Sequence, residues 1–237
     1  YKVRLLYKEE IRTCGKDAKN IVSLGTAGFV MQLTNSLVSI CCNNVLSATG
    51  GDVYVSVMTI ISSVRQMIET PIWSISEGSS PVISYNYGAK RPKKVIEAWI
   101  TMSVLALIYS LIAWSVILFA PKFLIGIFSS DKSLMIDTVP AMKLYFSAFI
   151  FMLFQYTGQT MFKSLNKKKQ AIFFSILRKV IIVVPMTYMF PYVFHMGSNG
   201  VFMAEPVSNV IGGSLCFIVM LLTVLPELKQ MNSDLSS

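Results

Sequence analysis

Ionised side chains stand inside long apolar stretches of this sequence, where their chemistry needs an explanation. Arg65 and Glu69 are four residues apart, a spacing that places two side chains on one face of a helix. Glu77 lies two turns further along the same face, and Trp73 lies between the two acids. An acid beside an aromatic ring can bind an organic cation through charge attraction and cation–π contact. The alternatives are a structural ion pair of Arg65 with Glu69 and simple solvation of Glu77.

Amide side chains and one further acid complete the set of candidate residues. Amides in apolar helices either bond neighbouring helices together or line a watery cavity. Glu205 follows Gly200 closely, so a wet interface explains it as well as a functional role does. Tyr156 is included beside Gln155, although aromatic residues at such positions more often pack. The residues that we predict to line a substrate or ion pathway are Gln32, Asn35, Arg65, Glu69, Trp73, Glu77, Gln155, Tyr156, Gln159 and Glu205.

The sequence gives no support for catalysis or for a metal centre. His195 is the one histidine, and the four cysteines show no spacing typical of metal ligands. Phosphate-binding motifs of the GxxxxGK[ST] and GxGxxG types do not occur. We therefore expect a protein that is not an enzyme and that needs neither a cofactor nor a metal.

Six apolar stretches must position these side chains, and five of them are about as long as the ~20 residues that cross a bilayer. The 237 residues are 54% hydrophobic and 14% charged, whereas about a quarter of the residues in soluble domains are charged. We predict an all-α polytopic membrane protein with six transmembrane helices. The stretches are Ile21–Leu46, Val53–Ser84, Val95–Ala120, Ala141–Phe162, Ile172–Phe194 and Val201–Leu225.

The second stretch is longer than a bilayer is thick. As one continuous helix it must tilt, protrude into the cytoplasm or break, and Pro71, Gly78 and Pro81 offer places to bend.

The net charge of +9 is distributed unevenly along the chain. Cations gather before the first stretch, between the second and third, between the fourth and fifth, and after the sixth, which is the positive-inside pattern. This pattern places both termini in the cytoplasm of a multi-pass plasma (inner) membrane protein, and it argues against nucleic acid as a partner. We expect a cytoplasmic linker at 1–20, a transmembrane lobe at 21–225 and a cytoplasmic tail at 226–237.

A second group of residues is predicted to fix the topology rather than to bind a substrate. Tyrosines sit where an aromatic belt lies, and the cations that follow hold the loop beside anionic lipid. Arg178 lies inside the fifth stretch, and we expect its side chain to reach back to the inner interface. The predicted anchors are Tyr85, Tyr87, Gly88, Lys90, Arg91, Lys93, Lys94 and Arg178.

The order of these features resembles the MATE (multidrug and toxic compound extrusion) transporters. The segment "PVISYNYGAKRPKKV" is similar to the end of their eighth helix, and "LGTAGFVMQLTNSLVSI" to their seventh. The segment "GGDVYVSVMTIISSVRQMIETP" resembles the start of the eighth helix. Two further segments, "SILRKVIIVVPM" and "GSNGVFMAEPVSNVIGG", resemble parts of the eleventh and twelfth. The resemblance covers essentially the whole chain.

The resemblance implies a twelve-helix transporter of which this chain is the C-terminal six-helix lobe. Such proteins export small amphipathic or cationic compounds in exchange for H⁺ or Na⁺ by alternating access. The expected partners are the lipid bilayer, the missing N-terminal lobe of the same polypeptide and the substrate. The lobe alone is not expected to transport.

One position departs from the family pattern. Many members carry a glutamate in the seventh helix that handles the coupling ion, and Asn35 stands at the matching place. The coupling carboxylate is then Glu69, Glu77 or Glu205, or it lies in the N-terminal lobe, which we favour.

Two other functions stay open as alternatives. One is a flippase of lipid-linked saccharides from the same superfamily, which would need several cations along its cavity. The other is a six-helix membrane partner subunit of a larger complex.

Overall fold

The computed structural model describes residues 15–234, and side chains for Val22, Phe29 and residues 32–233. All regular structure in this part of the chain is helical, as predicted. Two π-helical turns, η1 and η2, continue into α8 and α10 without a break. The elements are α2 (Gly15–Gly88), α3 (Pro92–Phe119), α4 (Pro121–Phe128), α5 (Lys132–Tyr145), α6 (Phe149–Ser164), α7 (Lys168–Ile176), η1 (Leu177–Val183), α8 (Val184–Tyr192), α9 (Ser198–Ser208), η2 (Asn209–Gly213) and α10 (Ser214–Asp234).

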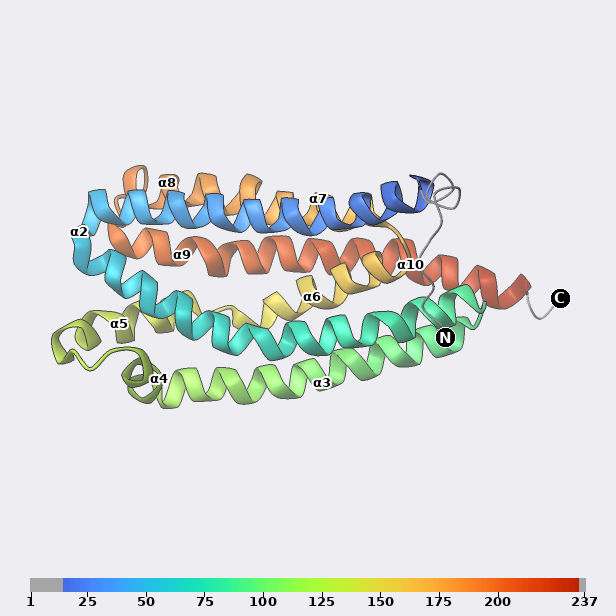
Figure 1. The fold of residues 1–237 in the computed structure, drawn as a ribbon. Coiled ribbons are helices and arrows are strands. Elements are labelled where there is room, and N and C mark those ends of the chain that lie inside the picture. Colours follow the sequence, from blue (N-terminus) through green and yellow to red (C-terminus); the bar gives the residue numbers. More distant parts are fainter. Residues whose placement is uncertain (1–14, 235–237) are drawn as a thin grey trace, which may run out of the picture.

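Helix α2 is a hairpin of two helical arms, 15–50 and 52–88. Gly51 joins them with φ 70° and ψ −170°, a backbone conformation that glycine adopts without a steric penalty. Figure 1 shows the chain turning back at this end of the molecule, so that the two arms run in opposite directions. Within the second arm, Pro71 and Pro81 lie inside the helix without interrupting it. The alternative of a break within the second stretch was therefore wrong. As one continuous helix, residues 52–88 measure roughly 55 Å.

The number of membrane spans depends on how bent helices are counted. Within the described residues, four helices are long and apolar enough to cross a membrane, or five if α5 and α6, bent by 51°, form one span. This count takes the described part of α2 as one helix. The prediction of six spans thus stays a prediction, as do the boundaries of the linker, lobe and tail. Part of the linker and the end of the tail lie outside the described residues.

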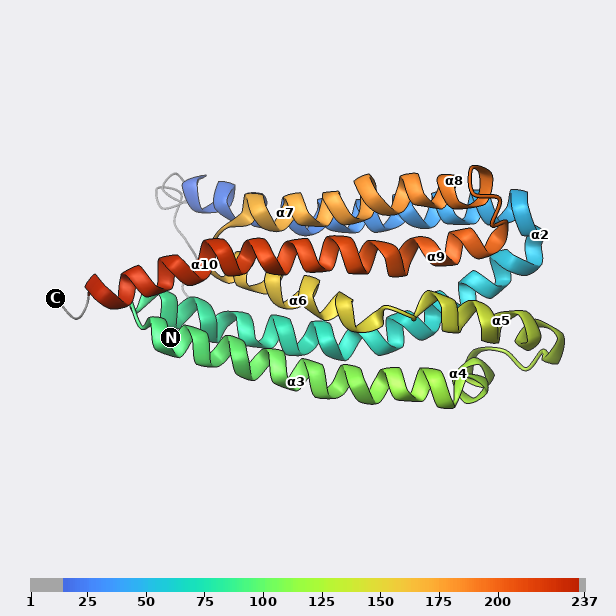
Figure 2. The same cartoon turned by 180° about the vertical axis from the view of Figure 1, so that it is seen from behind.

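The helices form a bundle in which α9 and α10 run through the middle, as the two opposite views show (Figures 1 and 2). Helix α3 lies along the second arm of α2, and the first arm lies beside α7 and α8. Backbones come close where α6 meets η2, since a Cβ atom on Gly213 would lie 2.4 Å from the carbonyl oxygen of Phe151. Small residues allow such close packing of membrane helices.

The segment after α2 forms the turn that the sequence indicates. Helix α2 ends at Gly88, and α3 begins at Pro92, which occupies the first turn, where proline is tolerated. Tyr85 is exposed, whereas the hydroxyl of Tyr87 donates to Glu227 of α10 across 2.5 Å. Glu227 also forms an ion pair with Lys167. The role of this segment at the membrane interface stays a prediction.

The turn between α4 and α5 has a polar cap. Asp131 accepts hydrogen bonds from the backbone N–H and the hydroxyl of Ser133, both through Oδ1. These donations favour the ionised carboxylate and hold the pKa of Asp131 below its usual value. Asp131 is thus the N-cap residue of α5, and its hydrogen bonds fix where the helix begins.

Candidate functional site

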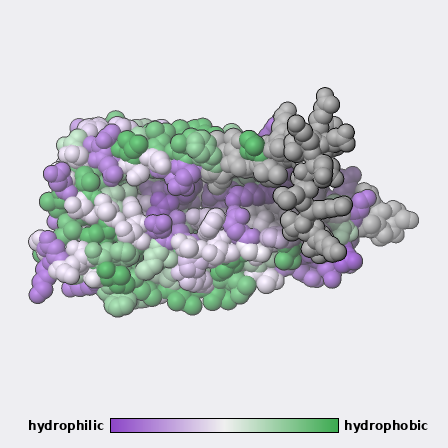
Figure 3. Space-filling view, in the orientation of Figure 1, coloured by the Kyte–Doolittle hydropathy of each residue, from purple (hydrophilic) through white to green (hydrophobic). Residues whose placement is uncertain are grey.

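A polar recess of about 520 Å³ lies between the two arms of α2. Figure 3 shows hydrophilic side chains along the middle of this face, with hydrophobic bands above and below. The lining side chains come from both arms of α2 and from α5, α6, α7, η1 and α9. Every predicted pathway residue except Glu77 lines this recess: Gln32, Asn35, Arg65, Glu69, Trp73, Gln155, Tyr156, Gln159 and Glu205.

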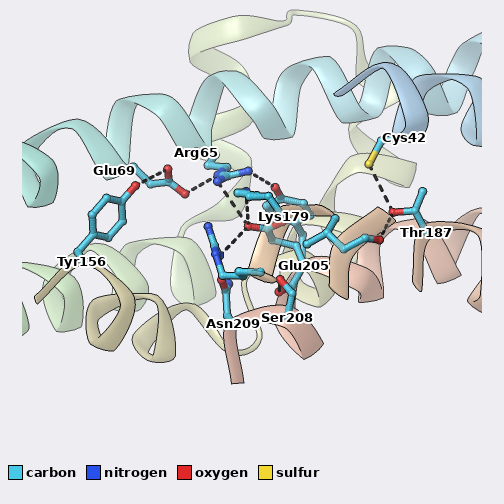
Figure 4. Close-up of polar contacts among 12 residues, drawn as sticks. Cys42, Arg65, Glu69, Tyr156, Lys179, Thr187, Glu205, Ser208 and Asn209 are labelled. Atoms are coloured by element: carbon cyan, nitrogen blue, oxygen red, sulfur yellow. Dashed lines mark hydrogen bonds and ion pairs between the residues drawn. The ribbon is translucent and has the colours of Figure 1, made fainter. Parts of the chain in front are cut away.

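Arg65 and Glu69 form the ion pair that their spacing predicts, on the face of α2 that looks into the recess. Arg65 also donates through Nη1 to the hydroxyl of Tyr145 across 2.9 Å. The hydroxyl of Tyr156 donates to Oε2 of Glu69 across 3.2 Å, which ties α6 to the second arm of α2. Figure 4 shows that these contacts continue into a larger ionic cluster.

Glu205 is the centre of this cluster. Its Oε1 atom lies 3.3 Å from Nη1 of Arg178, 3.3 Å from Nζ of Lys179 and 3.4 Å from Nη2 of Arg65. Arg178 donates in addition to Oδ1 of Asn209. The side chain of Glu205 is only 6% exposed, so the alternative of a wet interface at the outer end of the last span was wrong.

Arg178 was also placed wrongly, because its side chain turns into the bundle and is buried. Two local features explain the inward direction. Arg178 and Lys179 lie in the π-helical turn η1, a widened form of helix that is frequent at functional sites. Gly212 leaves the space for the arginine stem, since a Cβ atom there would lie 2.8 Å from Cγ of Arg178.

The sequence interpretation missed Lys179, Tyr145 and Asn209 as members of the site. A usable signal was present for Lys179, namely two adjacent cations within an apolar stretch and an acid in the next one. Tyr145 and Asn209 carried no such signal, because a tyrosine and an asparagine are ordinary within helices of this kind.

The amides divide into two groups. Gln155 and Gln159 on α6 are buried and donate to backbone carbonyl oxygens of α7, at Phe174 (3.4 Å) and Ala171 (3.3 Å). These bonds between helices are the ones expected of buried amides. Gln32 and Asn35 are exposed and line the recess from the first arm of α2.

Glu77 lies apart from the recess and pairs with Lys163 of α6, whose Nζ is 2.6 Å from Oε1. Trp73 is 52% exposed and lines the recess. Glu69 and Glu77 are thus held by different cations. Within the described residues, no three histidine, cysteine or acidic side chains are grouped as metal ligands.

Replacing Glu77 with glutamine is expected to change little. Its side chain is 37% exposed and that of Lys163 is 32% exposed, and partly exposed ion pairs contribute about 0–1 kcal/mol. The melting temperature and transport rate of Glu77→Gln in the full-length protein should match the unmodified protein. A loss of transport comparable with that of a recess variant would return Glu77 to the pathway.

Apolar helices surrounding a charged recess define an integral membrane protein. A family model described as MatE matches residues 28–189, and the chain therefore belongs to the MatE family. No curated protein matches the sequence.

Solved structures share the fold at low sequence identity. A MATE structure in the straight conformation is 19% identical with a TM-score of 0.82, and the match covers 92% of this chain and 48% of that one. An outward-facing MATE multidrug resistance transporter has 19% identity, a TM-score of 0.81 and the same coverage. So does a Pyrococcus furiosus transporter of the MOP superfamily, described as having a binding pocket of reverse polarity. The chain spans about half the length of these proteins.

Proposed function

We propose that this chain is the C-terminal lobe of a secondary transporter that exports small organic compounds by alternating access in exchange for H⁺ or Na⁺. The observation that carries the proposal is the ionic cluster around Glu205, which lines an open recess in an otherwise apolar bundle. Ionised groups at membrane depth are costly, and they mark substrate and ion pathways. Transporter lobes place such sites where two repeats face each other.

An N-terminal lobe would complete the recess. The chain covers 48% of the structures that it resembles, and its polar face is open between the arms of α2. Each arm of α2 is long enough to cross a bilayer, which supports a lobe of six spans within a twelve-helix protein. Cytoplasmic termini and a place in the plasma membrane belong to the same proposal.

The coupling carboxylate belongs in the other lobe under this proposal. Asn35 stands where many family members have a glutamate, and it lines the recess without a charge. Glu69 and Glu205 are both held by cations. The sequence favours cationic substrates, but three cations line the recess against two carboxylates, so its own charges do not favour them.

Transport by the full-length protein is testable in everted membrane vesicles that carry a proton or sodium gradient. We expect at least one compound of a mixed panel of organic cations and anions to dissipate a gradient, measured with a pH- or sodium-sensitive dye. Arg65→Gln should reduce this exchange at least tenfold, because Glu69 and Glu205 lose a shared partner. Lys143→Gln is the control, since Lys143 is exposed and lies outside the recess. Exchange that is equal in both variants, or absent from the unmodified protein, would contradict the proposal.

One observation favours a second function, that of a lipid-linked saccharide flippase. Such a protein needs several cations in its cavity, and the inward direction of Arg178 and Lys179 supplies two beside Arg65. Translocation of a fluorescent polyprenyl pyrophosphate in proteoliposomes, without any gradient, would identify this activity.

A further inference from the structure

The ionic cluster in the recess carries one excess positive charge. Among the described residues that line the recess, the cations are Arg65, Arg178 and Lys179, and the carboxylates are Glu69 and Glu205. A net charge inside a membrane protein is unfavourable unless a counter-charge or water stabilises it. The three cations therefore favour an additional negative charge in the recess.

Lys179 and Arg178 contact one carboxylate each, that of Glu205, whereas Arg65 contacts both Glu69 and Glu205. Glu69 pairs with Arg65, whereas Oε1 of Glu205 is shared among all three cations at 3.3–3.4 Å. An ammonium group has three N–H donors, and the ion pair with Glu205 uses one of them. Both Lys179 and Arg178 line the recess, so a ligand there can reach their donors.

A second observation at the floor of the recess also indicates a ligand. Gln155 is 3% exposed and lines the recess, and its Oε1 atom is buried without a hydrogen-bond partner. Buried acceptors in folded proteins nearly always have a partner, from the protein, water or a ligand. The backbone nitrogen of Gln155 and the aliphatic stem of Arg178 lie against neighbouring glycines of η2, Gly213 and Gly212. Charged donors and an acceptor without a partner therefore belong to residues that line the same recess.

We propose that the recess binds organic compounds through an anionic group, a carboxylate, sulfonate or phosphate, which Lys179 and Arg178 hold. The inference rests on the proposed transport function and names its substrate class. The body of the compound lies in the rest of the recess, which Trp73 also lines, and a hydroxyl or amine on it can donate to Gln155. A cavity of about 520 Å³ falls within the roughly 300–1,000 Å³ typical of small-molecule sites.

Lys179→Gln is the informative variant because it is expected to fold. Removing Lys179 leaves two cations, Arg65 and Arg178, against two carboxylates, so the cluster becomes neutral instead of losing its balance. Lys179→Arg keeps the positive charge and adds a fork of donors suited to a carboxylate. Lys143→Gln removes one exposed cation outside the recess and controls for the change in net charge.

Equilibrium binding to the full-length protein in lipid nanodiscs tests the proposal without requiring transport. Two dyes with the same xanthene ring system serve as probes, fluorescein as the anion and tetramethylrhodamine methyl ester as the cation. Fluorescence polarisation is read against empty nanodiscs. We expect fluorescein to bind at least tenfold more tightly than the cation. Lys179→Gln should weaken fluorescein at least tenfold, while Lys179→Arg and Lys143→Gln should retain its binding.

Several results would overturn the proposal. These are a preference for the cationic dye, equal binding of the two dyes, binding of neither, or unchanged fluorescein binding by Lys179→Gln. The last result is expected if Lys179 sheds its proton and leaves the cluster neutral without a ligand. Anion binding without gradient-driven exchange would preserve this inference and contradict the proposed transport function instead.

Competition for bound fluorescein separates two sources of the anionic group. The measured quantity is the concentration of each competitor that displaces half of the bound fluorescein. If benzoate and naphthalene sulfonate need the same concentration as farnesyl pyrophosphate or a lower one, the site is assigned to soluble organic acids. Displacement by farnesyl pyrophosphate at far lower concentrations assigns it to the head group of a polyprenyl lipid. Either result supports an anion site.

Discussion

Glu205→Gln is expected to lower the melting temperature of the full-length protein by on the order of 10 °C. The substitution removes the carboxylate that Arg65, Arg178 and Lys179 share and leaves Glu69 as the one acid in the cluster. Breaking a buried ion pair by removing one partner costs about 3–5 kcal/mol, because the remaining charges stay buried without compensation. For a folding unit of the size of this lobe, each kcal/mol corresponds to roughly 2–4 °C.

Two further variants show whether charge balance is the cause. Glu97→Gln makes the same substitution at an exposed site on α3 and should leave the melting temperature unchanged. Glu205→Gln combined with Lys179→Gln restores the original excess of one charge and should recover part of the loss. If the melting temperature of Glu205→Gln equals that of the Glu97→Gln control, the ionic cluster does not stabilise the lobe.

Gly213→Ala is expected to have the second-largest effect. Its Cβ atom would lie 2.4 Å from the carbonyl oxygen of Phe151 and 3.3 Å from the carbonyl carbon, so two backbones must move apart. Overpacking of this kind costs about 1–3 kcal/mol. Because η2 also carries Gly212, which accommodates Arg178, we expect a lower melting temperature and weaker ligand binding in the recess.

The matched control is Gly78→Ala in the second arm of α2. A Cβ atom there meets nothing within 4 Å, and the residue is helical. Alanine is favoured over glycine within a helix by about 1 kcal/mol, so this variant should be equally or more stable. A thermal shift assay on both variants distinguishes crowding from the general effect of an added methyl group. Equal melting temperatures would rule out tight contact between α6 and η2.

The sequence predicted the parts of the site that depend on local spacing. The pairing of Arg65 with Glu69 follows from four residues of separation on a helix. The side-chain amides of Gln155 and Gln159 donate hydrogen bonds to backbone carbonyl oxygens of α7, which is one of the two roles that the sequence predicted for them.

The centre of the site could not be predicted, because the hydropathy pattern indicates how deep a residue lies in the membrane but not whether its side chain points into the helix bundle. Arg178 was assigned to the interface by its position near the cytoplasmic end of an apolar stretch. Its actual direction depends on the π-helical turn and on space left by Gly212, which belongs to another element. Glu205 was ambiguous for the same reason, since its partners lie 26 or more residues away.

The meeting of α2, η1 and α9 at one carboxylate oxygen has a mechanical consequence. A displacement of any one of these elements would have to break several charged contacts together. The lobe should therefore move as a rigid body, and under the proposed transport function a change of access would take place by movement of one lobe against the other. If the full-length protein works by the alternating access proposed above, Glu205 would keep the recess intact while the recess changes the side of the membrane to which it opens.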